Sequence, residues 1–360
     1  MAKLFEKLFR PALFRLDAEN AHELGIKSIE MGLGSSAARR IASAKYQVDF
    51  PYPIERFGLS FNNPLGIAAG FDKNGRVVNQ LASLGFGFVE VGTVTLRPQP
   101  GNEKPRMFRL SADKALINRL GFNNEGAHAV AHRLSQLKRE CVVGVNIGKN
   151  KEVPNEEAVA NYMAVFDLMH PASDYVTVNI SSPNTPNLRE LQHAENLDEL
   201  LGALQRRNRE LGAKPLLVKI APDLAEAEIE EAVAVCRTHQ VSGMIATNTT
   251  VSREGLVTQN VNAVGSGGLS GRPVFARSTE VISCIYRCSA GHMPIIGVGG
   301  IFDAQDAFAK ITAGASLLQA YTGFVFGGPG FARDINTGLL RLLEDGGFST
   351  LDDAVGCRAG

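Results

Sequence analysis

The segment from Asn179 to Thr185 (NISSPNT) concentrates side chains that can hydrogen-bond but carry no charge. An asparagine presents a donor and an acceptor on one side chain, as needed to bind the edge of an imide or a lactam. The preceding run, Tyr175–Ile180, is rich in strand-forming residues and predicts a buried strand. Taken alone, the segment also fits an ordinary Asn/Ser/Pro turn after a strand. The pattern favours a pocket for a flat, amide-rich ligand at the end of this strand.

Polar residues follow other apolar runs in the same way. The runs and the polar or small residues at their ends are Leu65–Ala69 with Gly70, Asp72 and Lys73, Phe88–Gly92 with Thr93, Val142–Ile147 with Asn146 and Lys149, Leu216–Ile220 with Lys219, and Met244–Thr247 with Asn248 and Thr249. Unrelated turns would not keep placing Asn, Thr and Lys at the same point of successive strands. A solvated position at the rim is the alternative for either lysine. It fits Lys73 better than Lys219, which lies within its apolar run.

These runs indicate the fold that positions the polar residues. With Ile295–Val298 and Leu317–Ala320 there are about eight apolar runs, and the stretches between them, such as Ala225–His239 and Asp303–Ala313, have helical periodicity. Repeated strand–helix alternation predicts an α/β fold of the (β/α)8 TIM-barrel type. In such a barrel the carboxyl ends of all strands meet at one rim, where active sites lie.

Three connections at this rim are longer than a barrel needs: Thr93–Glu125, Ser181–Ala194 and Thr249–Val274. Long loops in compact domains tend to be lids or binding loops. Both Thr185–Ala194 and Thr249–Val274 fit a lid. In the last connection, glycines predict hinge-like freedom: Gly265, Gly267, Gly268 and Gly271.

The last two predicted strands end in GVGG (Gly297–Gly300) and AYTG (Ala320–Gly323). In many barrels the loops at these two positions bind a phosphate through backbone N–H groups, and glycine lets the backbone approach the oxygens. A bare GxGG can also mark a tight turn. Its position, with Gly271 and Tyr321-Thr322 nearby, favours a phosphate anchor for a substrate or for flavin mononucleotide (FMN).

The bulk composition excludes several classes of protein. The chain has 360 residues, is 44% hydrophobic, and balances 37 basic with 37 acidic residues, so nothing suggests a nucleic-acid partner. Its five cysteines are scattered, which indicates a reducing compartment rather than a disulfide scaffold. Cys284 and Cys288 share a predicted helix face without a second ligand pair, so we expect no metal site. His128 and His132 fit a surface helix.

The first 45 residues precede the barrel and are amphipathic. Leu4, Phe5, Leu8 and Phe9 share a helical face closed by Pro11, and Asp17 is placed to cap a second helix that contains Ala21, Leu24, Ile29 and Met31. Basic residues accompany them: Lys3, Lys7, Arg10, Arg15, Lys27, Arg39 and Arg40. The segment fits either a helical hairpin packed on the barrel or a monotopic membrane foot. No run predicts a spanning helix, a signal peptide or a transit peptide.

Nine segments resemble the class 2, membrane-associated dihydroorotate dehydrogenases. They are NPLGIAAGFDKNG, VGTVTLRPQPGNEKPR, INRLGFNNEG, VNIGKNK, VNISSPNTPNLR, VKIAPDL, ATNTT, GGLSGRP and PIIGVGGI, and they span roughly residues 63 to 328. The resemblance implies an FMN-dependent barrel that oxidises dihydroorotate to orotate in pyrimidine (UMP) biosynthesis and passes electrons to a membrane quinone, ubiquinone or menaquinone. It also implies a quinone-access segment (1–45), a catalytic barrel (46–345) and a C-terminal tail (346–360) with no assigned function.

The resemblance assigns roles to individual residues. It implies FMN contacts at Ala69, Gly70, Lys73, Thr93, Asn146, Asn179, Lys219, Thr247, Gly271, Gly300, Tyr321 and Thr322. It implies an orotate pocket formed by Lys73, Asn118, Arg119, Leu120, Gly121, Phe122, Asn179, Asn184, Asn248 and Thr249. Ser182 takes the position of the catalytic base.

The implied reaction removes a proton from C5 and a hydride from C6, and the hydride passes to the flavin. Lys219 would stabilise the negative charge of the reduced flavin, and Lys73 would pair with the substrate carboxylate. A serine hydroxyl is a weak base, so Ser182 must pass its proton onward through water near Thr185 and Phe122. Class 1 relatives use a cysteine there, so a serine favours class 2. The expected location is the cytoplasmic face of a bacterial inner membrane.

Other functions share parts of this pattern. A class 1 enzyme or a flavin-dependent reductase of RNA pyrimidines would have the same barrel, but Ser182 and the N-terminal segment oppose the first and the balanced charge opposes the second. A flavin-free lyase could use Lys219 as a Schiff-base nucleophile. A non-catalytic membrane-binding module would not need Asn, Ser and Lys at one rim.

Overall fold

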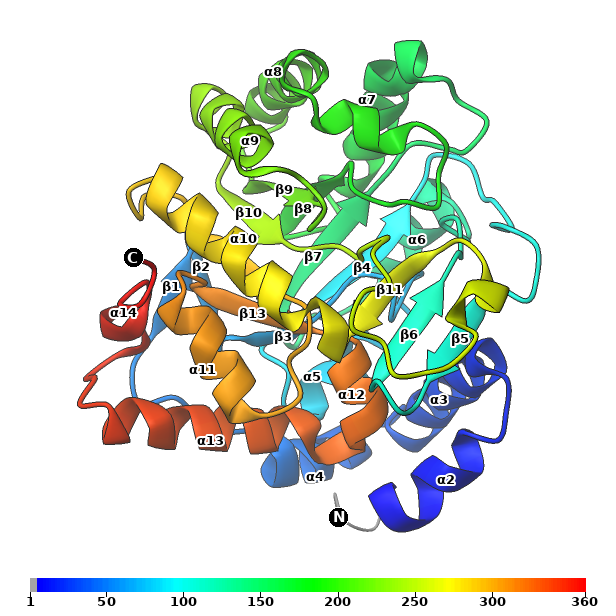
Figure 1. Cartoon of the computed structure of the whole chain (residues 1–360), viewed down its shortest axis with the longest axis vertical. Helices are drawn as coiled ribbons and strands as arrows, with labels where there is room; N and C mark the ends of the chain where they lie inside the picture. The colour runs from blue at the N-terminus through cyan, green and yellow to red at the C-terminus, as the bar shows by residue number, and fades with distance from the viewer. Residues whose placement is uncertain (1–4) are drawn as a thin grey trace.

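A closed barrel of eight parallel strands lies at the centre of the computed structural model, which describes residues 5–360 (Figure 1). Around the barrel the order is β10-β12-β13-β3-β4-β7-β8-β9. The strands are β3 (Leu65–Ile67), β4 (Phe88–Val94), β7 (Val142–Ile147), β8 (Tyr175–Asn179), β9 (Leu216–Ile220), β10 (Gly243–Ala246), β12 (Ile295–Val298) and β13 (Leu317–Ala320). They are the eight predicted runs with small shifts at their ends, so the predicted barrel is confirmed.

Helices surround the barrel and shield its outer face (Figure 1). They are α5 (Val78–Ser83), α6 (Ala127–Ser135), α7 (Ala158–Met169), α8 (Ala194–Glu210), α9 (Glu226–Thr238), α10 (Phe275–Cys288), α11 (Ala304–Thr312), α12 (Thr322–Gly327) and α13 (Phe331–Asp345). The two helices predicted from periodicity are α9 and α11. Asp303 caps α11 by accepting the N–H of Asp306 at 3.0 Å. His128 and His132 are exposed on α6, as expected for a surface helix.

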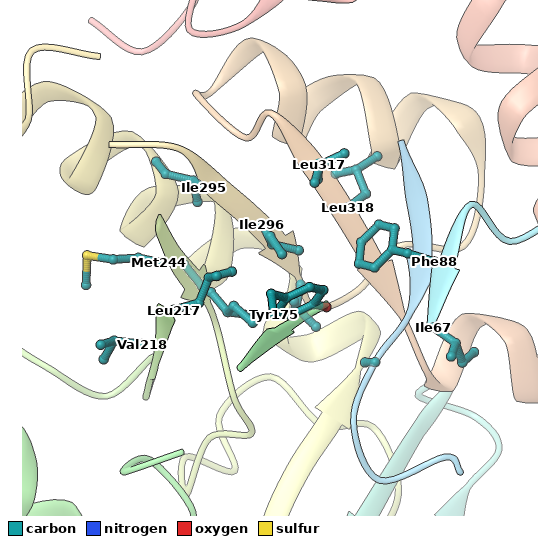
Figure 2. Packing of buried hydrophobic residues seen from close by; sticks show 14 of the residues in the cluster. Ile67, Phe88, Tyr175, Leu217, Val218, Met244, Ile295, Ile296, Leu317 and Leu318 are labelled. Atoms are coloured by element: carbon teal, nitrogen blue, oxygen red, sulfur yellow. The ribbon is translucent and has the colours of Figure 1, made fainter. Parts of the chain in front are cut away.

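Buried apolar side chains pack along the barrel strands, as the close-up in Figure 2 shows. Tyr175 and Phe88 are fully buried there. Small residues on neighbouring strands make room for them, because a Cβ on Gly144 would lie 2.0 Å from the Tyr175 ring and one on Gly66 2.5 Å from the Phe88 ring. Below them, a hairpin of β1 (Ile54–Arg56) and β2 (Leu59–Phe61) packs Phe61 edge-on against Phe88. The packed lower half leaves the carboxyl rim for a site.

A small antiparallel sheet lies beside the rim and was not predicted. It consists of β5 (Met107–Leu110), β6 (Ala115–Asn118) and β11 (Gly268–Gly271), in the order β11-β6-β5. Two of the predicted long loops therefore contain strands that pair with each other, with Gly268 opposite Asn118. The prediction of hinge-like freedom is wrong for Gly268 and Gly271, because both belong to a paired strand.

The N-terminal segment forms helices of which one packs against β5 and the last against α5 (Figure 1). Its helices are a π-helical turn (Phe5–Phe9), α2 (Arg10–Leu13), α3 (Ala18–Gly32) and α4 (Ser36–Tyr46). Asp17 caps α3 as predicted, accepting the N–H groups of Glu19 and Asn20. Pro11 does not close the first helix, because it sits at the start of α2, where a missing N–H is harmless. Lys3, Leu4 and the side chain of Leu8 lie outside the described residues.

The C-terminal residues pack on the barrel helices. Thr350 caps α14 (Leu351–Ala354), and Leu351 and Ala354 are buried. The backbone carbonyl of Ala359 accepts hydrogen bonds from Ser283 and Arg287 of α10. Within residues 5–360, no helix combines the length and the apolar character needed to cross a membrane.

Candidate active site

A cavity opens at the carboxyl rim of the barrel, where the strand ends converge. Most residues assigned to FMN or orotate line it, and they come from all parts of the chain. They are Ala69, Gly70, Lys73, Thr93, Asn118, Leu120, Gly121, Phe122, Asn179, Ser182, Asn184, Lys219, Thr247, Asn248, Thr249, Gly271, Gly300, Tyr321 and Thr322. The fold therefore brings together residues that are up to about 250 positions apart in the sequence.

Three neighbouring strands contribute a hydrogen-bonded group at the cavity floor. Thr93 on β4 donates its hydroxyl to Asn146 Oδ1 on β7 at 2.5 Å. Asn179 on β8 donates from Nδ2 to Thr93 Oγ1 at 2.9 Å and to Asn146 Oδ1 at 3.0 Å. All three side chains are buried, so these bonds fix the direction in which each amide points.

Three further amides form the wall of the cavity. Asn248 Nδ2 donates to Ser181 Oγ at 2.9 Å, and the Ser181 hydroxyl donates to Asn179 Oδ1 at 3.1 Å. Asn184 Nδ2 lies 3.3 Å from Asn118 Oδ1. Asparagines on separate segments are thus linked to one another around the cavity, which suits a ligand with several amide edges.

Ser182 lies in the loop after β8 and is 5% exposed. Its hydroxyl oxygen accepts the N–H of Asn184 at 3.2 Å, the one hydrogen bond to this hydroxyl among residues 5–360. No histidine or carboxylate of the described chain contacts it. The Thr185 hydroxyl nearby in sequence is buried and has no partner among the described residues. The serine and this free hydroxyl could each bond a water or a ligand.

Two lysines bring positive charge to the cavity. Lys219 on β9 is 5% exposed; burial lowers its pKa, and the negative charge of Glu90 opposes that effect. Burial also lowers the pKa of Lys73, and the carboxylates of Glu23 and Glu19 on α3 act against it. A cation in a dry cavity interacts with a bound anion more strongly than in water.

The end of the cavity assigned to a phosphate is formed by backbone. Gly271 has φ +100°, and a Cβ there would lie 2.3 Å from the Lys114 carbonyl oxygen. Gly300 has φ +73°, and a Cβ there would meet Phe275 at 2.5 Å. Only glycine fits both positions without strain. The Ser270 and Thr322 hydroxyls, 2.9 Å apart, line the same end.

Two of the assigned residues do not line the cavity. Asn146 is fully buried beneath the cavity, where its Oδ1 accepts hydrogen bonds from Thr93 and Asn179. Arg119 turns away: its Nη1 donates to the carbonyl oxygens of Val264 and Ser266 at 2.6 and 2.9 Å. The arginine thereby fastens the segment before β11 instead of reaching into the cavity.

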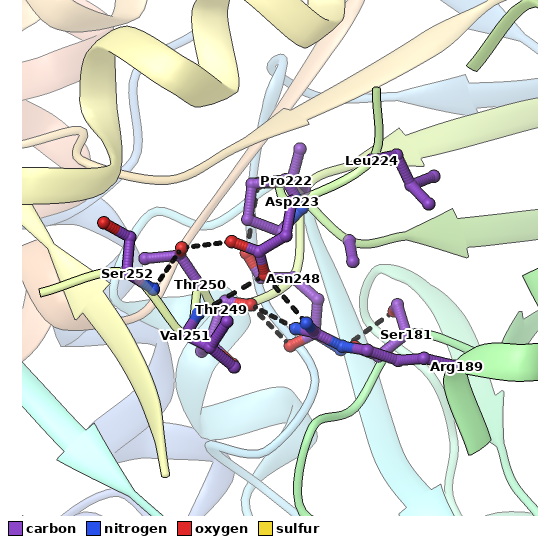
Figure 3. Close-up of polar contacts among 12 residues, drawn as sticks. Ser181, Arg189, Pro222, Asp223, Leu224, Asn248, Thr249, Thr250, Val251 and Ser252 are labelled. Atoms are coloured by element: carbon purple, nitrogen blue, oxygen red, sulfur yellow. Dashed lines mark hydrogen bonds and ion pairs between the residues drawn. The ribbon is translucent and has the colours of Figure 1, made fainter. Parts of the chain in front are cut away.

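Sequence reasoning missed several residues at the site. Gln319 on β13 lines the cavity, and Glu90 on β4 lies buried beside Asn146. Figure 3 shows a third, Arg189, which contacts the Ser181 carbonyl oxygen at 3.1 Å, Asp223 at 2.8 Å and the Thr249 carbonyl oxygen at 3.0 Å. Glu90 and Gln319 are polar residues inside apolar runs. This interruption was the feature of the sequence that could have indicated a role for both at the site.

A second cavity lies between the N-terminal helices and the barrel, lined largely by apolar side chains. It shares Met107, Leu116 and Tyr321 with the first cavity, so the two adjoin. His22 of α3 lies in its lining and packs against the rings of Phe71 and Tyr321, and burial lowers the pKa of His22 to about 3. The imidazole is therefore neutral at physiological pH.

A family model described as dihydroorotate dehydrogenase matches residues 54–343. This chain belongs to the dihydroorotate dehydrogenase family. A relative from Anaeromyxobacter dehalogenans, named dihydroorotate dehydrogenase (quinone), is 50% identical over 356 residues, covering 96% of this chain and 95% of the relative. One of the same name from Christiangramia forsetii is 49% identical and covers 95% of this chain and 100% of the relative. The resemblance to class 2 is confirmed.

Solved structures of the family have the same fold. The ligand-free enzyme from Eimeria tenella is 38% identical, with a TM-score of 0.87, and the match covers 95% of this chain and 99% of that one. The complex of the Eimeria enzyme with ferulenol is 36% identical, with a TM-score of 0.84 and 95% coverage of both chains.

Proposed function

We propose that this dihydroorotate dehydrogenase oxidises (S)-dihydroorotate to orotate in pyrimidine biosynthesis, using FMN, and delivers the electrons to a membrane quinone. One observation carries the proposal: a polar cavity with asparagines and lysines adjoins an apolar cavity under the N-terminal helices. The first suits a small amide-rich anion next to a flavin, and the second suits a quinone head group. The shared wall allows both to reach the same cofactor.

The residues of the polar cavity fit FMN. Gln319 Oε1 is buried without a partner among the described residues, and it lines the cavity, where a ligand N–H would satisfy it. Gly271 and Gly300 would let the backbone approach the phosphate, and Lys219, Thr93 and Asn179 would contact the ring system. Bound FMN would accept the hydride that leaves C6 of the substrate. The chain's own residues have to orient the substrate and remove the second hydrogen as a proton.

The substrate would lie against the amide groups of Asn118, Asn184 and Asn248. Lys73 would pair with its carboxylate, since the ammonium group lines the cavity. Ser182 would take the proton from C5 and pass it to water bound near the Thr185 hydroxyl, which has no partner among the described residues. A closed, dry site is needed, because a serine without a neighbouring base is a weak acceptor.

Residues 1–45 would bind the membrane surface and admit the quinone, while residues 46–345 would form the catalytic unit and 346–360 a tail. The described helices of this segment expose large apolar side chains, among them Phe9, Leu24, Met31 and Ile41. Two of these, Phe9 and Leu24, also line the apolar cavity, so its mouth lies next to the exposed patch. This arrangement supports peripheral attachment to a membrane surface, and the surface we propose is the cytoplasmic face of a bacterial inner membrane.

Identification of the cofactor tests the proposal. The purified protein should be yellow, should release FMN on denaturation, and should show a perturbed flavin spectrum when orotate is added. A colourless protein would contradict the proposal. If such a protein were also trapped at Lys219 by borohydride in the presence of a carbonyl substrate, a Schiff-base lyase would replace it.

A further inference from the structure

Glu90 is a charged group that the proposed reaction does not use. It lies on β4, fully buried beneath the polar cavity. Its Oε1 accepts Asn146 Nδ2 at 2.9 Å, and its Oε2 accepts the hydroxyls of Tyr175 and Thr177 at 3.1 and 3.2 Å and Gln319 Nε2 at 2.9 Å. Four donors therefore converge on the two oxygens of this buried side chain. A buried anion of this kind is costly unless a cation compensates it.

Lys219 is the cation that faces Glu90. It lies on β9, across the barrel interior from β4, and its electrostatic interaction with Glu90 favours its charged form. No other charged group acts on Lys219 among the described residues. The other titratable groups here are the Tyr175 phenol and, next to it, the Cys141 thiol; burial raises the pKa of both, so both are neutral near pH 7.

We propose that Glu90 is a positioning residue for the cofactor. It places a carboxylate beneath the cavity, behind Lys219, and it fixes the directions of two amides, Asn146 and Gln319. The inference rests on the proposed function, since it concerns how the chain prepares for a flavin that gains negative charge on reduction.

The relative positions of Glu90 and Lys219 support an effect of Glu90 on the lysine. Lys219 lines the cavity and Glu90 does not, so the positive end of the pair lies nearer to a bound ligand. A lone buried lysine would tend to lose its proton. Glu90 behind it favours the charged form of the lysine, which can stabilise the developing negative charge without rearrangement.

The amide contacts support the second part. Asn146 donates to Glu90 through Nδ2, so its Oδ1 is left to accept from Thr93 and Asn179. Gln319 donates to Glu90 through Nε2, so its free Oε1 becomes an acceptor at the cavity. Had either amide the opposite orientation, it would place N–H groups where these acceptors now lie.

The test is Glu90→Gln, measured on the flavin-loaded enzyme. We expect FMN to bind about tenfold more weakly, because the two amides lose their fixed orientation.

We also expect the midpoint potential of the variant, relative to that of the wild type, to fall as the pH rises from 6 to 9. Burial lowers the pKa of Lys219 and Glu90 opposes that effect, so without Glu90 the lysine should lose its proton at a lower pH than in the wild type. Asp113→Asn, which changes a buried carboxylate that binds Val257 and Thr258 outside the cavity, should leave the potential unchanged.

A second background shows whether Glu90 acts through Lys219. In Lys219→Met, adding Glu90→Gln should no longer change the pH dependence of the potential. The inference would be overturned if Glu90→Gln and the wild type differed in potential by the same amount at every pH. It would also be overturned if Glu90→Gln changed the pH dependence equally in the wild type and in Lys219→Met. If Glu90→Gln does not fold, Glu90→Asp keeps the carboxylate but withdraws it from Lys219 and the two amides, and it should change the potential in the same direction by less. A wild-type protein without flavin would refute the proposed function instead.

Discussion

Ser182 faces the polar cavity with a hydroxyl that accepts only the Asn184 N–H among residues 5–360. We expect Ser182→Ala to keep FMN and to slow the bleaching of the flavin by dihydroorotate by about 10²- to 10⁴-fold, the range for loss of a general base. Anaerobic stopped-flow absorbance measures this rate directly. A variant within twofold of the wild type would remove Ser182 from the mechanism.

The matched variant is Ser182→Cys. A thiol has an unperturbed pKa of about 8.5, so it loses its proton and can act as a base more easily than a hydroxyl does. We expect it to recover part of the lost rate, and we expect that rate to rise between about pH 7 and 9 as the thiolate forms. Equal rates for the Ala and Cys variants at every pH would show that position 182 does not accept the proton.

Lys310 is a second buried lysine, and it affects stability rather than the cavity. Its Nζ donates to the Ser278 and Thr279 hydroxyls, and burial lowers its pKa to about 7, from 10.5 in the unfolded chain. Between pH 7 and 10.5 the unfolded chain binds more protons at Lys310 than the folded chain does. The contribution of Lys310 to stability is therefore most favourable near pH 10.5 and is lost as the pH falls to 7. The full effect is on the order of 5 kcal/mol.

Lys310→Met should remove this dependence. Neither hydroxyl loses its own acceptor, because Ser278 donates to the Val298 carbonyl oxygen and Thr279 to that of Phe275. In urea unfolding, the variant should be more stable than the wild type at pH 7, and the difference should shrink by pH 9.5. The exposed Lys138→Met is the control. A difference that does not change with pH would show that Lys310 is not the group responsible.

At the scale of secondary structure, Arg189 joins the connections that follow three strands. It contacts the segment after β8, Asp223 after β9 and the Thr249 carbonyl oxygen after β10 (Figure 3). We expect Arg189→Met to raise the KM for dihydroorotate about tenfold and to change kcat less, because the loops that carry Ser182 and Thr249 lose their common support. Steady-state kinetics with a soluble quinone separates the two parameters. A fall in kcat alone would contradict a positioning role.

The N-terminal helices carry the prediction for membrane binding. Met31 and Ile41 are 86% and 74% exposed, so changing both to serine should not affect folding. We expect the double variant to bind anionic vesicles at least tenfold more weakly, since each side chain contributes roughly 1.5–3 kcal/mol when buried in an apolar phase. Flavin bleaching by dihydroorotate should be unchanged. Val257→Ser alters another exposed side chain, outside these helices, and should not affect vesicle binding. Equal vesicle binding by the double variant and the wild type would locate the membrane contact elsewhere.

The sequence predicts the barrel strands well because each is an apolar run bounded by polar residues. It does not predict the sheet of β5, β6 and β11, because these strands are four residues long and β11 pairs with a segment about 150 positions earlier. The glycines of β11 predict a hinge when only their neighbours in the sequence are considered, because the strand that pairs with them lies far away in the chain. Local composition cannot reveal a pairing between distant segments.

At the scale of the whole molecule, the two adjoining cavities could not be predicted from any one segment. The sequence indicates which residues end the strands, but Met107, Leu116 and Tyr321 form a common wall only after the small sheet, the barrel and the N-terminal helices have packed together. The same holds for Glu90 and Gln319, whose contact joins residues 229 positions apart. Tertiary packing therefore determines both the common wall of the two cavities and the carboxylate beneath the site.

One measurement tests the coupling of these cavities most directly. Dihydroorotate is added anaerobically to the purified protein while the flavin absorbance is followed, and a soluble quinone is injected after the absorbance has settled. The proposed function predicts bleaching on the first addition and full recovery on the second. No bleaching would contradict the proposed oxidation of dihydroorotate. Bleaching without recovery would contradict the quinone role of the apolar cavity.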